Sequence, residues 1–263
     1  MNIWWRSLIS AFLGIWIVIA PRQAISEEVP VIAAASNLQH ALTEIARIFK
    51  DQTGKDVKLT FGSSGNFVRQ IKEGAPFEIL FSADESFIFD IADDGLTADR
   101  GEIYAIGRIV IIAPHSSPVK VDSSLEGLKA ALANGDITRF SIANPEHAPY
   151  GRRAEEALKH AGLWESLKDK LVLGENISQA AQFAMSGSSQ GGIIAYSLAL
   201  APEIGKHGNF ALIPEDWHSP LRQRMVLMKT AGATATAFFA FMRSPAARVI
   251  MDRYGFLLPS EAS

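Results

Sequence analysis

The sequence is organised around Thr60-Phe61-Gly62-Ser63-Ser64-Gly65, which joins a strand pattern to a helix pattern. The alternating Val57-Lys58-Leu59 precedes it, and residues 66–72 follow with helical spacing of their apolar side chains. Its two glycines let the backbone approach a ligand, and its two serines are favoured N-cap residues whose hydroxyls can also donate to a guest. A helix start has free N–H groups and the positive end of the dipole, which suits an anion. Taken alone, the stretch favours an ordinary capped helix over a ligand site.

The same arrangement recurs twice in the first half of the chain. An apolar strand pattern over 31–34 ends at Ala35-Ser36-Asn37, and Glu78-Ile79-Leu80-Phe81 ends at Ser82-Ala83-Asp84. Three successive strands therefore end in serine-containing turns, and ligands of open α/β sheets bind at the carboxyl ends of strands. The helices that follow the first and third strands have these expected buried residues: Leu38, Leu42, Ile45 and Phe49 in the first, and Phe87, Phe89, Ile91 and Ala92 in the second.

Strand and helix patterns continue to alternate along the rest of the chain. This alternation predicts an α/β protein with mostly parallel sheets flanked by helices. We expect two lobes with the ligand cleft between them, one formed by 27–108 with 223–263 and the other by 109–222. The chain crosses between the lobes near 109–114 and again near 221–228, and we expect hinges there.

The first 26 residues have the pattern of a signal peptide. A short segment with one positive charge, Arg6, precedes an apolar run over 7–20, and Ala24-Ile25-Ser26 fits a cleavage site. Fourteen mostly apolar positions fall short of the roughly 20 that a spanning helix needs. We expect export with cleavage near Ser26, no membrane anchor and a periplasmic location, with secretion to the medium as the alternative.

Charge and cysteine content narrow the function further. The chain of 263 residues carries a net charge of −3, which loss of Arg6 and Arg22 with the leader would lower to −5. It has no long basic run, so nucleic acid is not an expected partner. It has no cysteine, which excludes disulfides and a lipid-bearing N-terminal cysteine.

Several motifs bear on other possible functions. Gly187-Ser188-Ser189-Gln190-Gly191 matches the nucleophile elbow of serine hydrolases, but a helix pattern precedes it and a strand pattern follows, the reverse of the order that the elbow needs. The six histidines lack the spacing of metal ligands, and no phosphate-binding P-loop occurs. We interpret His147 as a solvated loop histidine, while Tyr150 follows a proline at a helix start and is a candidate for the site.

The candidate site combines neutral hydrogen-bond donors. Hydroxyls, an amide and helix N-terminal N–H groups supply no full cation and no carboxylate, which suits a small anion that carries no proton. The members are Ser36, Asn37, Ser63 or Ser64, Tyr150 and Ile177, with Ala83 as a weaker candidate.

On these residues the chain resembles the periplasmic molybdate-binding proteins of molybdate ABC transporters, which have the type II periplasmic binding protein fold. The resemblance covers essentially all of 29–256 and rests on five stretches: Ala33-Ala34-Ala35-Ser36-Asn37, Phe61-Gly62-Ser63-Ser64-Gly65, the segment from Gly74-Ala75-Pro76 to Phe81-Ser82-Ala83-Asp84, residues 145–151, and Tyr254-Gly255-Phe256.

The resemblance implies a monomeric binding protein, not an enzyme, that captures molybdate or tungstate without a further cofactor and delivers it to a membrane permease. It implies ligand contacts from Ser36, Ser64, Tyr150 and the backbone N–H of Ile177. Some members place a tyrosine where Ala195 stands here, which leaves open whether the neighbouring Tyr196 contacts the ligand, and Tyr150 is the available tyrosine. Two alternatives stay open, namely a protein for sulfate or another oxyanion and a serine hydrolase that uses Ser189.

Overall fold

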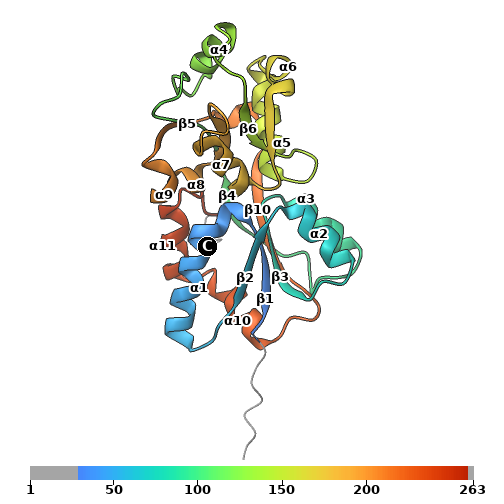
Figure 1. Ribbon diagram of the computed structural model, residues 1–263. Coiled ribbons are helices and arrows are strands. Elements are labelled where there is room, and N and C mark those ends of the chain that lie inside the picture. The colour runs from blue at the N-terminus through green and yellow to red at the C-terminus, as the bar shows by residue number, and fades with distance from the viewer. Residues whose placement is uncertain (1–28, 260–263) are drawn as a thin grey trace, which may run out of the picture.

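The computed structural model describes residues 29–259 and has two lobes, each built on a five-stranded sheet (Figure 1). The first sheet has the strand order β2-β1-β3-β10-β4, and the second has the order β7-β6-β8-β5-β9. We call the part around the first sheet the first lobe and the part around the second sheet the second lobe. In the first, the strands are β1 (Val31–Ala35), β2 (Lys58–Gly62), β3 (Phe77–Ser82), β4 (Glu102–Gly107) and β10 (Leu221–Leu227). In the second, they are β5 (Ile109–Pro114), β6 (Phe140–Ala143), β7 (Leu171–Gly174), β8 (Gly192–Ala195) and β9 (Gly208–Leu212).

Each sheet is mixed because one of its strands runs against the others. β1 pairs in parallel with β2 and β3, and β6 pairs in parallel with β7 and β8. The reversed strands are β10 in the first sheet and β5 in the second, and each is antiparallel to both of its neighbours. These are the two strands that the chain enters as it crosses from one lobe to the other. The predicted α/β architecture with mostly parallel strands in two lobes is confirmed.

Helices follow most of the strands and cover the sheets (Figure 1). No helix within residues 29–259 combines the length and the apolar character needed to cross a membrane. In the first lobe the helices are η1 (Ser36–Leu38), α1 (Gln39–Thr53), α2 (Ser64–Lys72), α3 (Glu85–Asp93), α10 (Ala233–Phe241) and α11 (Pro245–Arg253). In the second they are α4 (Glu126–Ala133), α5 (Pro149–His160), α6 (Trp164–Leu167), η2 (Lys168–Lys170), α7 (Ile177–Met185), α8 (Tyr196–Ala199), α9 (Pro202–Gly205) and η3 (Glu215–Trp217).

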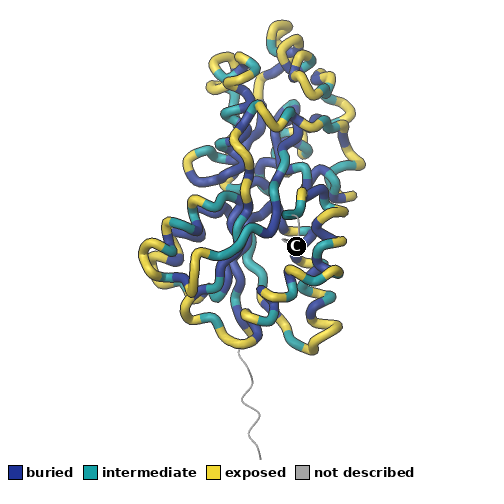
Figure 2. The backbone as a smooth tube through the Cα atoms, turned by 180° about the vertical axis from the view of Figure 1, so that it is seen from behind, coloured by how far each residue is buried: buried dark blue, intermediate teal, exposed yellow. Residues whose placement is uncertain are grey.

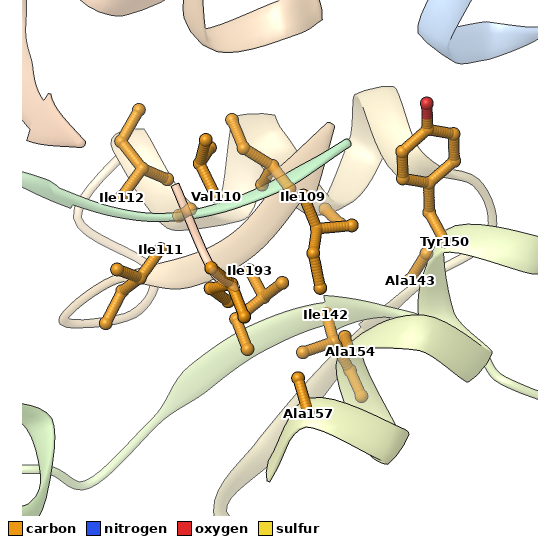
Figure 3. Packing of buried hydrophobic residues seen from close by; sticks show 14 of the residues in the cluster. Ile109, Val110, Ile111, Ile112, Ile142, Ala143, Tyr150, Ala154, Ala157 and Ile193 are labelled. Atoms are coloured by element: carbon orange, nitrogen blue, oxygen red, sulfur yellow. The ribbon is translucent and has the colours of Figure 1, made fainter. Parts of the chain in front are cut away.

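Burial is concentrated on the strands and on the helix faces that cover them, while loops and outer helix faces are exposed (Figure 2). The first helix buries the predicted stripe of Leu38, Leu42, Ile45 and Phe49 and ends at Gly54 in the left-handed conformation that glycine favours. In the second lobe, Ile109, Ile142 and Ile193 bring β5, β6 and β8 together in a core of branched side chains (Figure 3).

One predicted apolar face was only partly right, since Ile91 is buried as expected while Ala92 is half-buried. In α3 the fully buried residues are Ile88 and Ile91, whereas Phe87 and Phe89 are only half-buried. The two phenylalanines serve as platforms for cations instead, because Arg152 lies over the ring of Phe87 and Arg100 and Arg224 lie over that of Phe89. Cation–π contacts of this kind hold aromatic rings at a polar surface.

Two connections carry the chain between the lobes. Arg108 alone separates β4 from β5, and residues 213–220 lead from β9 to β10. The C-terminal segment pairs with the end of β4, just before the first connection, because Leu257 and Ile106 form an antiparallel bridge. The residue boundaries of the lobes stay a prediction, and β10 begins at Leu221, just before the predicted return at 223.

Candidate functional site

A small pocket lies between the lobes, with about 190 Å³ of empty space. Turns after β1, β2 and β3 form one wall, and the starts of α5 and α7 form the other. All seven residues named as candidates from the sequence line it, and no charged side chain does. The lining residues are Ala35, Ser36, Asn37, Gly62, Ser63, Ser64, Ala83, Ala148, Pro149, Tyr150 and Ile177.

Ser36 connects the first strand of the first lobe to α7 of the second. Its Oγ accepts a hydrogen bond from the backbone N–H of Ser178 at 3.3 Å, and the Ser178 hydroxyl donates to the carbonyl oxygen of Ser36 at 3.0 Å. Because the Ser36 oxygen already accepts a bond, its own hydroxyl proton is available to the pocket.

Ser64 has the same arrangement within the first lobe. It is fully buried, and its Oγ accepts a 3.0 Å hydrogen bond from the backbone N–H of Ala83. The hydroxyl proton of Ser64 is therefore available to the pocket, while the N–H of Ala83, a weaker candidate for ligand contact, is used to orient Ser64.

The N-cap position expected for one of the two serines is confirmed, but its side chain does not cap the helix. Ser63 occupies the N-cap position of α2, yet its side chain makes no capping hydrogen bond. Its Oγ lies 3.0 Å from Nδ1 of His147 in the second lobe. Glu175 lies 3.6 Å from Nε2 of the same histidine, so His147 is held between one residue of the first lobe and one of the second. A contact between segments 84 residues apart has replaced a local cap.

Tyr150 enters the pocket from the start of α5, and Figure 3 shows its hydroxyl pointing away from the labelled apolar side chains. Its Oη accepts a 2.9 Å hydrogen bond from Nε2 of Gln223. Burial raises the pKa of Tyr150 above its ordinary value of 10.0, although bonds from Gln223 and Asn37 act in the opposite direction. The tyrosine is therefore neutral and keeps a proton to donate.

Gln223 is the site residue that the sequence analysis did not identify. It is fully buried, and its Oε1 accepts from Nδ2 of Asn37 at 3.0 Å and from the hydroxyl of Tyr104 at 2.7 Å. Oδ1 of Asn37 is buried without a hydrogen-bond partner in the described part of the chain. A signal for Gln223 was present, because strand alternation places it on the buried face of β10 with Leu221 and Met225.

Three helices of nine or more residues begin at this pocket, namely α2, α5 and α7. The backbone N–H groups of Ser64, Tyr150 and Ile177 belong to their first turns, and none of the three has a protein partner within residues 29–259. At α7, Asn176 caps the N–H groups of Ser178 and Gln179 and leaves that of Ile177 free. Free N–H groups at converging helix starts create a positive potential without a charged side chain.

The two lobes are in contact around the pocket, so the structure is a closed state. An ion pair joins Asp84 to Arg153 at 2.9 Å, with both side chains largely buried. Further bonds between the lobes run from Gly65 N–H to the His147 carbonyl, from the Ser197 hydroxyl to the Asn37 carbonyl, and from Asn66 to Glu175.

His147 is not the solvated loop residue that we expected. Only 8% of it is exposed, and it packs against the start of α2 through Ser63 and Gly65. It does not line the pocket, so its part lies in the contact between the lobes.

Two other residues are placed outside the pocket. Tyr196 begins α8, with Arg108 stacked on its ring at 4.8 Å. The hydroxyl of Ser189 donates to the backbone oxygens of Phe183 and Gly191, in a turn between a helix and a strand. Among residues 29–259, no group of three or more histidine or acidic side chains could hold a metal ion.

The site thus presents mostly donors and no charged side chain, with Oδ1 of Asn37 as the one acceptor that lacks a partner in the described part of the chain. Three hydroxyls accept bonds from protein N–H groups and keep their own protons, and three backbone N–H groups lack partners. A buried donor without an acceptor is destabilising, so this lining suits a guest that offers several acceptor oxygens.

Comparison with known proteins agrees with this geometry. The profile of the bacterial extracellular solute-binding protein family matches residues 30–257. This chain belongs to that family. Its relatives include the molybdate-binding protein ModA of Rhodobacter capsulatus, 36% identical over 86% of this chain and 87% of the relative. Another is the protein of the same name from Escherichia coli K12, 33% identical over 86% of this chain and 88% of the relative.

A solved structure extends the likeness to the fold. The periplasmic molybdate-binding protein of Azotobacter vinelandii superposes with a TM-score of 0.79 at 30% identity, covering 88% of this chain and all of that one. The resemblance to molybdate-binding proteins is therefore confirmed. Proteins of this family act outside the cytoplasm, where they bind solutes for transport, and they are not enzymes. A serine hydrolase is therefore not favoured.

Proposed function

We propose that this extracellular solute-binding protein captures molybdate, or tungstate, between its lobes and delivers it to the permease of an ABC transporter. The names of its relatives support the ligand class, and the pocket supports a small tetrahedral oxyanion. The ligand enters as the intact oxyanion, held by the protein without a further cofactor. Ser36, Asn37, Ser64, Tyr150 and Ile177 are its proposed contacts, with Ser63 and Ala83 beside them.

The observation that carries the proposal is the state of the three pocket hydroxyls. Ser36, Ser64 and Tyr150 each accept a hydrogen bond from a protein N–H, so each has its proton left for the guest. A fully ionised oxyanion has only acceptors and matches such a lining. An ion whose proton faces one of these hydroxyls would bring a donor against a donor, which costs about 1–3 kcal/mol.

The proposal includes the cellular location and the oligomeric state of the protein. We place the protein in the periplasm as a monomer, released from a leader that ends near Ser26. The leader itself lies outside the described residues. Closure of the lobes gives the permease a shape that differs between loaded and empty protein.

Calorimetric titration with molybdate, tungstate and sulfate tests the proposal. Donors fixed on helix starts and strand ends cannot all move inward to a smaller ion, so molybdate and tungstate should bind and sulfate should bind more weakly. Ser36→Ala should lower the affinity for molybdate, whereas Ser166→Ala, at an exposed position of α6, should leave it unchanged. Equal affinity for sulfate would instead support a sulfate-binding protein, and no binding of any oxyanion would refute the proposal.

A further inference from the structure

We propose that Gln223 is a positioning residue that turns the Tyr150 hydroxyl proton into the pocket and so selects against oxyanions that keep a proton. The inference deepens the proposed function and rests on it. Gln223 does not line the pocket, and it acts only through Tyr150 and Asn37.

The orientation of the Gln223 amide follows from its partners. Its Oε1 receives two donors, the Asn37 amide at 3.0 Å and the Tyr104 hydroxyl at 2.7 Å. Two donors fill the two lone pairs of an amide oxygen, so the amide nitrogen is left to face Tyr150 at 2.9 Å. The Tyr150 oxygen is then an acceptor toward Gln223, and its proton must point elsewhere.

The reversed orientation is less compatible with these distances. Turning Gln223 alone would place its N–H groups against the N–H group of Asn37. Turning both amides would pair the Asn37 oxygen with the Gln223 nitrogen, but it would leave the Tyr104 hydroxyl proton with only the carbonyl oxygen of Ser82, at 3.4 Å instead of 2.7 Å. Hydrogen bonds between oxygens are favourable near 2.7–2.8 Å, so the network holds the first orientation.

The position of Gln223 in the fold stabilises this orientation of its side chain. It lies on β10, between β3 and β4 and just after the chain returns to the first lobe. Its partners come from three elements, η1 for Asn37, β4 for Tyr104 and α5 for Tyr150. All four side chains are buried, so water does not compete for their donors. The network therefore connects the crossing strand to residues from both lobes.

The test compares molybdate with hydrogen phosphate at mildly alkaline pH, where both ions carry two negative charges. Gln223→Glu replaces the N–H donor with an acceptor, so the Tyr150 proton turns to it and the tyrosine oxygen faces the pocket. We expect the ratio of molybdate to hydrogen phosphate affinity to fall about tenfold or more. The reason is that the turned Tyr150 oxygen can accept the proton of hydrogen phosphate, whereas it no longer donates to molybdate. An added charge repels both dianions alike, so the ratio reports the orientation of the hydroxyl.

Three further variants make the result decisive. In a Tyr150→Phe background, Gln223→Glu should leave the ratio unchanged, because there is no hydroxyl to turn. Gln223→Met frees the hydroxyl without a buried charge and should also lower the ratio. Gln52→Glu, at an exposed position of α1, should not change it.

The outcomes separate this inference from the proposed function. A ratio that stays constant in the folded Gln223 variants, or one that shifts equally in the Tyr150→Phe background, would refute the role of Gln223. Wild-type protein that binds molybdate while the ratio fails to move refutes only this role. Wild-type protein that binds no oxyanion refutes the proposed function itself.

Discussion

The backbone N–H of Gly65 donates a 3.0 Å hydrogen bond to the carbonyl oxygen of His147, joining the start of α2 to the segment before α5 in the other lobe. A β-carbon at Gly65 would lie 2.8 Å from that oxygen and 3.0 Å from Cβ of His147. Such distances are closer than ordinary contacts between non-bonded atoms allow. The lobes therefore meet at a point that leaves no room for a side chain.

Gly65→Ala should weaken ligand binding without unfolding either lobe. The added methyl group forces the lobes apart at His147, and overpacking of this kind costs about 1–3 kcal/mol, so affinity for molybdate should fall roughly tenfold or more. Calorimetry measures the affinity. Gly232→Ala is the matched control, because its β-carbon would meet only the end of the flexible Glu78 side chain, at 3.4 Å. Unchanged affinity in Gly65→Ala would show that binding does not need this closed contact.

Ser64→Ala should reduce both binding and stability. It removes a hydroxyl that donates to a charged guest, a loss of about 1.5–3 kcal/mol in binding, and it leaves the buried N–H of Ala83 unpaired, a loss of about 1–3 kcal/mol in the free energy of unfolding. Thermal unfolding without ligand and calorimetry with molybdate measure the two effects. Ser189→Ala also removes hydrogen bonds within its own lobe but should leave the affinity unchanged. The opposite ranking of the two variants would overturn the assignment of the site.

The affinity for molybdate should stay constant from neutral pH up to the ordinary tyrosine value of 10.0. Burial raises the pKa of Tyr150, so its hydroxyl keeps the proton that the ligand needs throughout this range. The pKa of Tyr150 is higher in the folded state than in the unfolded state. The contribution of the neutral tyrosine to folding stability is therefore complete below pH 10.0 and declines only at higher pH. Titrations across the alkaline range check this, with Tyr150→Phe as the control. A loss of affinity well below pH 10.0 that disappears in Tyr150→Phe would contradict it.

Ligand should compact the protein. The pocket is divided between the lobes, with Ser36 and Ser64 on one side and Tyr150 and Ile177 on the other, so the ion binds the closed state more tightly and shifts the population toward it. Small-angle scattering should show a smaller radius of gyration with molybdate than without it. The melting temperature should rise as well, by an amount equivalent to about 2.7 kcal/mol at a ligand concentration of 100 times Kd. An unchanged radius at saturation would mean that the lobes do not move.

The sequence predicted those parts of the fold and site that depend on local pattern. Strand ends carrying Ser36 and Ser64, and a helix start carrying Ile177, can be found from alternation and helical spacing. The carboxyl ends of parallel strands must then meet, which is why the candidates from these strands line one pocket. The apolar stripe of α1 was equally accessible because its period is regular.

Contacts between distant segments could not be read in the same way. Ser63 appears free to cap its helix until the closed state brings His147 against it, and His147 appears solvated for the same reason. Phe87 was expected on the buried face of its helix, yet Arg152 from the second lobe covers its ring instead. Gln223 was visible as a polar residue on a buried face, but its role depends on Tyr104 and Tyr150, which are 119 and 73 residues away.

The most direct measurement is a crystal structure of the protein grown with molybdate, in which anomalous scattering from molybdenum locates the ion without reference to the protein. The ion should lie between the lobes, with its oxygens within hydrogen-bond distance of the hydroxyls of Ser36, Ser64 and Tyr150 and of the N–H of Ile177, and with no charged side chain in contact. An ion bound within one lobe, or one held by a lysine or arginine, would contradict the account.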